Sequence, residues 1–351
     1  MTNYKIALIP GDGIGKEVLP EAVTVLEKIG GKFGISFEWR EFDWSCETYA
    51  KTGRMMPEDG IEQLRRFDAL FLGAVGYPGV ADHISLWGLL IPIRRAFRQY
   101  VNLRPIRLMQ GVSSPLAGRG PGDIDFTIVR ENNEGEYSEM GGRIYAGTER
   151  EMVIQESVFT RQGVDKVLQY AFELAKKRRG HVTSATKSNG IIHTMPFWDE
   201  RFEAMKAAYP GIEADQFHID ILSAHFVQHP DWFDVVVGSN LFGDILSDLG
   251  AAVVGGMGLA PAANINPEKE YPSMFEPVHG SAPDIAGRNI ANPIAQIWTA
   301  AMMLDHLGHE DAGLAVTGAI EAVLAEGANL TRDLGGNAST KQLGKTITDA
   351  L

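Results

Sequence analysis

Two aspartates four residues apart, Asp244 and Asp248, are candidates for binding a divalent cation. Ser239 and Asn240 before them favour the start of a helix, and Gly250 after them favours its end. On a helix this spacing places both carboxylates on one face, where they repel each other unless a positive charge lies between them. Mg²⁺ and Mn²⁺ prefer oxygen ligands of this kind. The pattern indicates a metal site, with two solvated helix acids as the alternative.

Arginines form a second group of candidates. Arg94 and Arg95 lie in a predicted helix, and Arg130 ends a predicted apolar strand. A guanidinium group binds a carboxylate through two parallel hydrogen bonds, and a cation that ends a buried strand usually faces a site. Ordinary ion pairs with the chain's own acids are the alternative, above all for Arg95 and Arg98. Arg130, at the end of its strand, fits the ion-pair alternative less well.

Tyr137 and Lys187 are candidates for proton transfer. Lys187 ends the predicted strand 181–187 and precedes Ser188 and Asn189. Such a lysine acts as a general base only if its pKa falls from about 10.4 toward 7 or 8, a shift of roughly 4 kcal/mol. Neighbouring arginines and a metal ion would supply that field. Taken one at a time, each of the two residues also fits a structural role.

The loop from Ile9 to Lys16 resembles a dinucleotide-binding loop but has the wrong spacing. Gly15 follows Gly13 by two positions, whereas the dinucleotide fingerprint needs its third glycine three positions after the second. No Gly-Lys-Ser/Thr sequence follows at the distance that a P-loop requires. We expect a tight strand-to-helix turn, with or without a contact to a ligand.

Composition excludes several classes of protein. The net charge of −13 over 351 residues disfavours a nucleic-acid partner. The single cysteine, Cys46, excludes an intrachain disulfide and a multi-thiolate zinc site, and it fits a reducing compartment. The chain begins directly with a strand pattern, and its longest apolar, glycine-rich stretch, 250–263, is shorter than a membrane span. We therefore expect a soluble cytoplasmic protein.

Short apolar runs alternate with amphipathic helical stretches, which predicts an α/β fold around a largely parallel sheet. The first half has predicted strands at 4–9, 35–42 and 69–72 with helices at 15–29, 57–67 and 86–98. Further strands are predicted at 124–129, 143–159, 181–187, 217–222 and 233–237, with helices at 161–178, 196–208, 293–307 and 312–324. Composition alone does not place a domain boundary.

Several of these segments together resemble the β-decarboxylating dehydrogenase family, which includes isocitrate, isopropylmalate, and tartrate or D-malate dehydrogenases. The resemblance covers nearly the whole chain in family order. The matching segments are IPGDGIGKE (9–17), NLRP (102–105), VREN-NEGEYS (129–138), TKSN (186–189), SNLFGDILSDLG (239–250) and FEPVHGSAPDIAGRNIANP (275–293).

The resemblance implies a two-lobed, isopropylmalate dehydrogenase-like fold with a mixed sheet flanked by helices, and not a Rossmann domain. Residues 1–99 and 252–351 would form the large NAD-binding lobe, and 100–251 the small lobe. The active site would be shared between the two subunits of a homodimer. The implied substrate clamp is Arg94, Arg104 and Arg130, the implied metal ligands are Asp220, Asp244 and Asp248, and the implied catalytic residues are Tyr137 and Lys187. Lys187 and Asp220 would come from the other subunit.

The resemblance also implies that NAD lies against the loop 279–284. The implied cofactor residues are His279, Gly280, Ser281, Ala282, Asp284 and Asn292. The carboxylate of Asp284 would accept hydrogen bonds from the ribose diol and would repel the 2′-phosphate of NADP. We therefore expect NAD with Mn²⁺ or Mg²⁺, and we leave open a role for a monovalent cation such as K⁺.

The expected reaction is oxidation of a 2-hydroxy diacid followed by loss of CO₂, with Lys187 as base and Tyr137 as acid. As the resemblance implies, Trp87 would fill space near the C3 substituent, and Gly190, next to Asn189, would remove an apolar wall where isopropylmalate enzymes look to have a valine. This pattern resembles the tartrate and D-malate branch, so we expect D-malate conversion to pyruvate and CO₂, or tartrate conversion to oxaloglycolate or glycerate. The alternatives are a 3-isopropylmalate dehydrogenase and a non-catalytic regulatory subunit.

Overall fold

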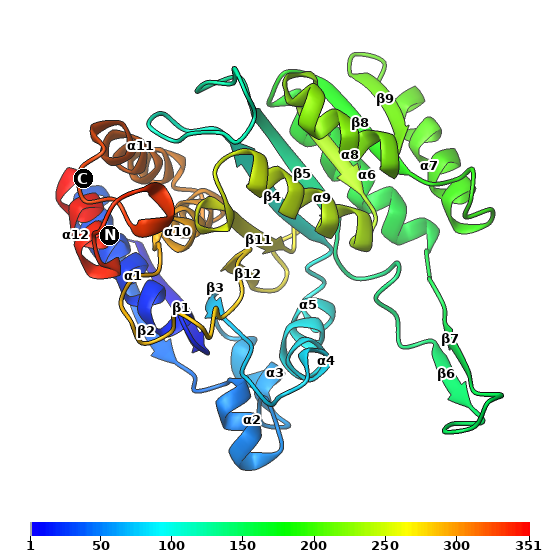
Figure 1. The fold of residues 1–351 in the computed structure, drawn as a ribbon, viewed down its shortest axis with the longest axis horizontal. Helices are drawn as coiled ribbons and strands as arrows, with labels where there is room; N and C mark the ends of the chain where they lie inside the picture. The colour runs from blue at the N-terminus through cyan, green and yellow to red at the C-terminus, as the bar shows by residue number, and fades with distance from the viewer. Residues whose placement is uncertain (1) are drawn as a thin grey trace.

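The computed structural model describes residues 2–351, and a single ten-stranded mixed sheet runs through it (Figure 1). In spatial order the strands are β2 (Ile35–Glu41), β1 (Thr2–Gly11), β3 (Ala69–Ala74), β12 (Ser273–Pro277), β11 (Pro261–Ile265), β4 (Val101–Arg107), β5 (Asp125–Glu131), β10 (Val235–Gly238), β8 (His181–Thr186) and β9 (Glu213–His218). The first four are parallel to one another, and so are the last four. Between them β11 and β4 each pair antiparallel with both neighbours. This strand order confirms an α/β fold that differs from a Rossmann sheet.

Helices cover both faces of the sheet, which explains why inner strands such as β3 and β10 are apolar without alternation and buried at every position. The helices are α1 (Gly15–Phe33), α2 (Cys46–Thr52), α3 (Gly60–Leu64), α4 (Asp82–Ser85), α5 (Ile91–Ala96), α6 (Arg161–Lys176), α7 (Thr194–Ala208), α8 (Ile219–Gln228), α9 (Asn240–Val253), α10 (Ile294–His306), α11 (Glu310–Glu326) and α12 (Thr340–Ala350). In Figure 1, α1 and α10–α12 gather at one end of the sheet and α6–α9 at the other. None of the helices within residues 2–351 combines the length and the apolar character needed to cross a bilayer.

The predicted lobes meet where β11 pairs with β4, through Ala263 and Leu103. The predicted boundary at 99/100 falls between α5 and β4. The predicted boundary at 251/252 falls inside α9. Because one continuous sheet joins the two halves, the division into lobes stays a prediction.

Two of the predicted strands were wrong. The range 217–222 is the end of β9 and the start of α8, so Asp220 lies in the first turn of a helix. Ile219, Leu222 and Phe226 recur there at helical spacing, and packing of the last two into the core selects the helix. The range 143–159 forms only the short hairpin of β6 (Gly141–Ile144) and β7 (Met152–Gln155).

This hairpin, which we call the arm, projects away from the rest of the chain (Figure 1). All eight of its strand residues are exposed. The large apolar side chains that it presents to solvent are Met140, Ile144, Tyr145, Met152, Val153 and Ile154. A two-stranded hairpin with no core of its own gains little stability by itself, so an apolar arm of this kind is typical of a contact surface.

Candidate active site

Helix α9 carries the two aspartates on the face that packs toward β4 and β5. Its N-terminal cap is Ser239, whose hydroxyl accepts a hydrogen bond from the backbone N–H of Phe242. The prediction that the helix ends at Gly250 was wrong, because it continues to Val253. Gly250 is instead a packing residue: a Cβ there would lie 2.9 Å from the Ile106 side chain on β4. Gly243 has the same role against Arg130, at 2.6 Å.

Asp244 is the centre of a cluster of predicted site residues. Its Oδ1 lies 3.2 Å from Arg104 Nη1 and also contacts Arg130 Nη1, and its Oδ2 accepts a 3.1 Å hydrogen bond from the Tyr137 hydroxyl. Burial raises the pKa of Asp244, but the charges of Arg130 and Arg104 outweigh it and hold that pKa below its ordinary value. Asp244 is therefore ionised at neutral pH, within a shell of donors.

Asp248 lies at the edge of this cluster, one turn along the helix. Its side chain is 60% exposed and its Oδ1 is 4.0 Å from Arg104 Nη1. Desolvation and the charge of Asp244 raise the pKa of Asp248 above its ordinary value. Two hard carboxylates that repel each other in this way fit a divalent cation, which would stabilise both in the ionised form.

The third predicted metal ligand, Asp220, lies elsewhere on the chain. Its carboxylate is 2.6 Å from Lys187 Nζ, and this hydrogen bond is the main reason that the pKa of Asp220 is low. The Asp220 side chain is 67% exposed. Within residues 2–351 no group of three or more His, Cys, Asp and Glu side chains is arranged to hold a metal ion. One chain thus brings together Asp244, Asp248 and Tyr137, and separately Lys187 and Asp220.

Three arginines surround the cluster, and all are buried: Arg94 is 7% exposed, Arg104 6% and Arg130 4%. The buried carboxylate of Glu276 on β12 accepts a 2.7 Å hydrogen bond from Arg94 Nη2. Burial and the neighbouring charge of Arg104 lower the pKa of Arg130 to about 10, so it stays charged at neutral pH. Three buried cations face two buried or half-buried carboxylates and, at the solvent edge, the exposed Asp248, so it is the buried part of the cluster that carries the positive excess suited to an anionic ligand.

Tyr137 lies in a loop that is held in place by hydrogen bonds to two glutamates of the same segment, Glu136 and Glu131. The carboxylate of Glu136 accepts hydrogen bonds from Ser239 Oγ (2.7 Å) and the backbone N–H of Leu241 (3.0 Å), both at the start of α9. Glu131 is buried and accepts the backbone N–H of Asn133 at 2.7 Å, and burial raises its pKa to about 7. Because Glu136 precedes Tyr137 directly, its hydrogen bonds tie the loop that carries Tyr137 to the helix that carries Asp244.

The predicted specificity residues do not all reach this cluster. A cavity of about 140 Å³ is lined by Arg94, Arg104, Glu276 and His279, with Leu90 rather than Trp87 in its wall. Trp87 is half-buried in a π-helical turn (Leu86–Leu90), 5.0 Å below the Arg95 guanidinium. Asn189 and Gly190 are exposed and lie beyond Lys187 in the chain. Their assignment to substrate binding stays a prediction.

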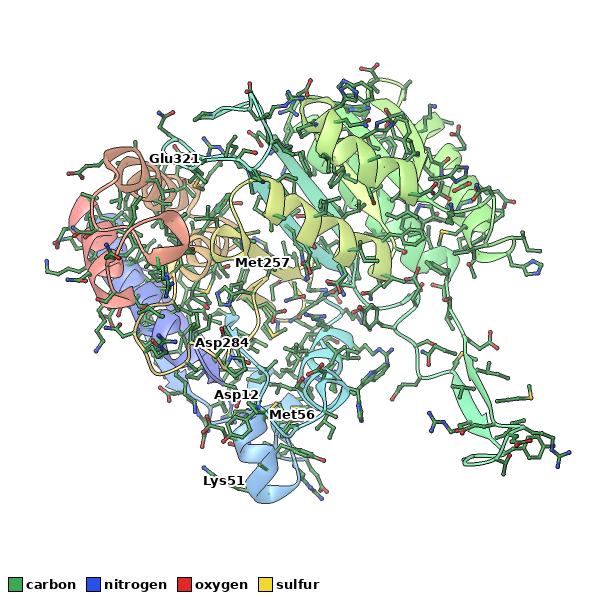
Figure 2. The ribbon with its side chains drawn as sticks, viewed as in Figure 1. Asp12, Lys51, Met56, Met257, Asp284 and Glu321 are labelled. Atoms are coloured by element: carbon green, nitrogen blue, oxygen red, sulfur yellow. The ribbon has the colours of Figure 1, made fainter. Side chains whose placement is uncertain are left out.

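A second cavity, of about 560 Å³, adjoins the predicted NAD loop. Its walls include His279, Ala282 and Asn292 from the prediction, and also Ile14, Met257, Ile285, Arg288, Arg332 and Asp333, which sequence reasoning missed. Figure 2 labels Met257 in this wall and Asp284, which is exposed, on the neighbouring loop. His279 lines both cavities, and Gly280 lines only the smaller one.

The His279 ring suits a position between two ligands. Burial lowers the pKa of His279, so the ring is neutral at pH 7. Its Nδ1 lies 3.0 Å from the carbonyl oxygen of Gly280, whereas Nε2 is buried without a hydrogen-bond partner within the described residues. A buried polar atom of this kind is usually satisfied by a ligand or an ordered water. The polar and apolar mixture of the larger cavity fits a dinucleotide.

The glycine loop before α1 packs against the loop that is predicted to bind NAD. A Cβ on Gly13 would lie 2.1 Å from the carbonyl oxygen of Ser281, and the backbone N–H of Ile14 donates to that oxygen at 2.9 Å. The Glu17 carboxylate accepts hydrogen bonds from the backbone N–H groups of Gly287 (2.6 Å) and Asn289 (2.8 Å). The predicted tight strand-to-helix turn is confirmed, and its glycines permit this close approach between two loops.

Replacing Glu17 by glutamine is expected to weaken NAD binding selectively. One of the two backbone N–H groups would then face an amide N–H₂ and lose its hydrogen bond. Because both N–H groups follow the loop that is predicted to bind NAD, we expect this loss to raise the Kd for NAD about tenfold. Isothermal titration with NAD measures the effect, with Glu27→Gln as the matched control, because Glu27 lies on the same helix and bonds only Trp39 among the described residues. An unchanged Kd for NAD in Glu17→Gln would refute this supporting role.

Comparison with known proteins gives the same picture over the whole chain. A profile of the isocitrate/isopropylmalate dehydrogenase family matches residues 5–347. The chain is 60% identical to D-malate dehydrogenase (decarboxylating) of Escherichia coli strain K12, over 99% of this chain and 98% of that one. It is 58% identical to tartrate dehydrogenase/decarboxylase of Pseudomonas putida, with the same coverage. Isocitrate dehydrogenase from Methylococcus capsulatus has the same fold, with a TM-score of 0.90, 34% identity and 99% coverage of both chains. The chain therefore belongs to the isocitrate/isopropylmalate dehydrogenase family.

Proposed function

We propose that this protein oxidises a small 2-hydroxy diacid with NAD and a divalent cation and removes the carboxyl group on C3, and that D-malate and tartrate are its substrates. The observation that carries the proposal is the cluster of Asp244, Tyr137 and three buried arginines next to a cavity that shares His279 with the larger NAD-sized cavity. The names of the relatives with 58–60% identity support the same reaction and the same two substrates.

In this proposal the arginines bind and orient the diacid. Arg94, Arg104 and Arg130 hold the carboxylate that is lost, because a guanidinium group matches a carboxylate with two hydrogen bonds. Their burial excludes water from that end of the substrate, which strengthens the interaction. The apolar side chains of Leu90 and Ala262 line this small cavity and leave room for only hydrogen or hydroxyl on C3. This limited room favours malate and tartrate over a substrate with a branched alkyl group.

Asp244 and Asp248, with Asp220 of a second copy of the chain, would hold Mn²⁺ or Mg²⁺. The bound cation supplies Lewis-acid stabilisation of negative charge on the substrate oxygens, and NAD supplies the hydride acceptor. The chain's own side chains move the protons. Lys187 takes the proton of the C2 hydroxyl, and Tyr137 gives a proton to C3 after CO₂ has left.

We further propose a homodimer in which each active site uses residues of both copies. Within one chain Lys187 and Asp220 pair with each other at an exposed position, apart from the Asp244 cluster. The helices that carry Asp220 and Asp244 expose Ile221, Val227 and Ile245, and the arm exposes six further apolar side chains. A second copy that covers these surfaces would bury this apolar area and bring its Lys187–Asp220 pair to the cluster.

The decisive experiment measures NADH formation with D-malate, the tartrate stereoisomers, isocitrate and 3-isopropylmalate, with Mn²⁺ and with a chelator. We expect the highest kcat/KM for D-malate or a tartrate, and loss of turnover in the chelator with recovery when Mn²⁺ is restored. A preference for 3-isopropylmalate would overturn the substrate assignment. Full activity in the chelator would overturn the metal assignment.

A further inference from the structure

Beneath the substrate arginines lies a network of buried amides to which neither the sequence motifs nor the mechanism assigns a role. Its central residue is Asn264 on β11, which is fully buried. Asn264 Oδ1 accepts hydrogen bonds from Asn102 Nδ2 (2.7 Å) and Asn132 Nδ2 (2.9 Å), and its Nδ2 donates to Glu276 Oε1 (2.7 Å). Its Nδ2 also donates to the carbonyl oxygen of Met274 at 3.3 Å, so the Asn264 side chain has one hydrogen-bonded neighbour on β4, two on β12 and one just after β5.

The network ends on both sides at an arginine of the cluster. Asn102 Oδ1 accepts from Arg104 Nε at 2.7 Å, and Glu276 Oε1 accepts from Arg94 Nη2 at 2.7 Å. The path from Arg104 through Asn102, Asn264 and Glu276 to Arg94 is therefore continuous and buried throughout. Arg94 and Arg104 come from different elements, α5 and β4, and this path fixes one relative to the other.

We propose that Asn264 is a positioning residue that sets the relative placement of Arg94 and Arg104 for the diacid. It touches neither substrate nor cofactor in this proposal and acts only through Asn102 and Glu276. The proposal rests on the proposed role of the two arginines in binding the diacid. Its physical basis is preorganisation: two guanidinium groups bind one diacid tightly only if their separation is fixed before the ligand arrives.

Asparagine suits this position because its two ends differ. The carbonyl oxygen of the Asn264 side chain meets two donors, whereas the amide N–H₂ meets two acceptors, the carboxylate of Glu276 and the backbone carbonyl of Met274. The charged groups around it are Glu276 from β12, Arg94 from α5, and Arg104 from β4, with Asp244 of α9 beyond Arg104. An Asn264→Asp substitution keeps the shape and the acceptor and puts a second carboxyl oxygen about 2.7 Å from Glu276 Oε1.

The test is the pH dependence of kcat/KM for D-malate in Asn264→Asp relative to wild type. At pH 8.5 both carboxyl groups compete for the Arg94 charge, and we expect a loss of about 10-fold to 100-fold, seen in the KM for D-malate and not in the KM for NAD. At pH 6 protonation of the introduced aspartate, which the like charge of the adjacent carboxylate favours, restores a donor toward Glu276, so the loss should shrink about tenfold. Equal losses at both pH values would overturn the proposal.

Asn266→Asp is the matched control. Asn266 is also fully buried and also presents Nδ2 to a glutamate, Glu268, at 3.3 Å, but it lies outside the path between the arginines. We expect its kcat/KM per folded protein to stay at the wild-type value at both pH values. A similar pH-dependent loss in Asn266→Asp would overturn the specific role of Asn264.

Asn264→Ser is a second variant that adds no charge and keeps the proposal testable if the aspartate variant does not fold. Its shorter side chain cannot reach both amides and Glu276, so we expect about a tenfold rise in KM for D-malate, equal at both pH values. Wild-type kinetics in Asn264→Ser would overturn the positioning role. Absence of turnover in the wild type with any diacid would instead overturn the proposed function.

Discussion

Replacing Asp244 by asparagine or Lys187 by alanine is expected to reduce turnover of D-malate by about 10³-fold, and mixing the two inactive variants is expected to restore activity. The asparagine side chain would preserve the helix but lack the negative charge that Arg104 and Arg130 surround in the wild type. Loss of the Lys187 amine removes the proposed base. After dissociation and reassociation of equal amounts, half of the dimers would be mixed and carry one intact site, so about a quarter of the wild-type rate should return.

The mixed pair of Asp244→Asn and Tyr137→Phe is the matched control. Tyr137 and Asp244 are hydrogen-bonded within one chain, at 3.1 Å, so a mixed dimer would carry one defect in each of its two sites. Its rate should remain at the mean of the two parents. If the Lys187→Ala mixture also stays at the parental mean, the proposed sharing of active sites between copies is wrong. The rate is measured as NADH formation with saturating D-malate and Mn²⁺.

The positions of several candidate site residues were predictable because they lie in dense local motifs. The helix around Asp244 and Asp248, its cap at Ser239, and the place of Arg130 at the end of a strand follow from short-range patterns, and the structure confirms these positions. The convergence of Arg104, Arg130 and Tyr137 on Asp244 was available only through the family resemblance. Residues more than a hundred positions apart carry no local signal of their contact.

Local sequence patterns could not identify the residues that support the candidate site. Glu17 and Glu276 lie in quoted motifs and Asn264 lies in the stretch between two of them, yet the roles proposed for all three depend on partners in other strands and loops. The error at Asp220 has a similar cause. A six-residue stretch such as 217–222, in which four residues are apolar, fits a strand or a helix equally, and the packing of Leu222 and Phe226 selects α8. Tertiary contacts decide such cases.

Tyr137→Phe is expected to slow turnover by about 10²-fold to 10⁴-fold while leaving the oxidation step fast. Burial and the charge of Asp244 raise the pKa of Tyr137, so its hydroxyl keeps the proton at neutral and mildly alkaline pH and is suited to act as an acid. Phenylalanine keeps the ring, whose centroid lies 5.6 Å from the Arg130 guanidinium carbon, and loses only the hydroxyl. The KM values for D-malate and NAD should therefore change little.

The kinetic signature of this variant separates the two halves of the reaction. If Tyr137 protonates C3 after CO₂ has left, stopped-flow absorbance should show a burst of about one NADH per active site, followed by a slow steady rate. Tyr209→Phe is the matched control. The Tyr209 hydroxyl also donates to a carboxylate at 2.7 Å, that of Glu173 on α6, and neither residue belongs to the Asp244 cluster. This variant should behave like wild type. No proton donor to C3 is needed before hydride leaves C2. If the first NADH in Tyr137→Phe forms as slowly as the later ones, Tyr137 therefore acts in the oxidation step and not in protonation of C3.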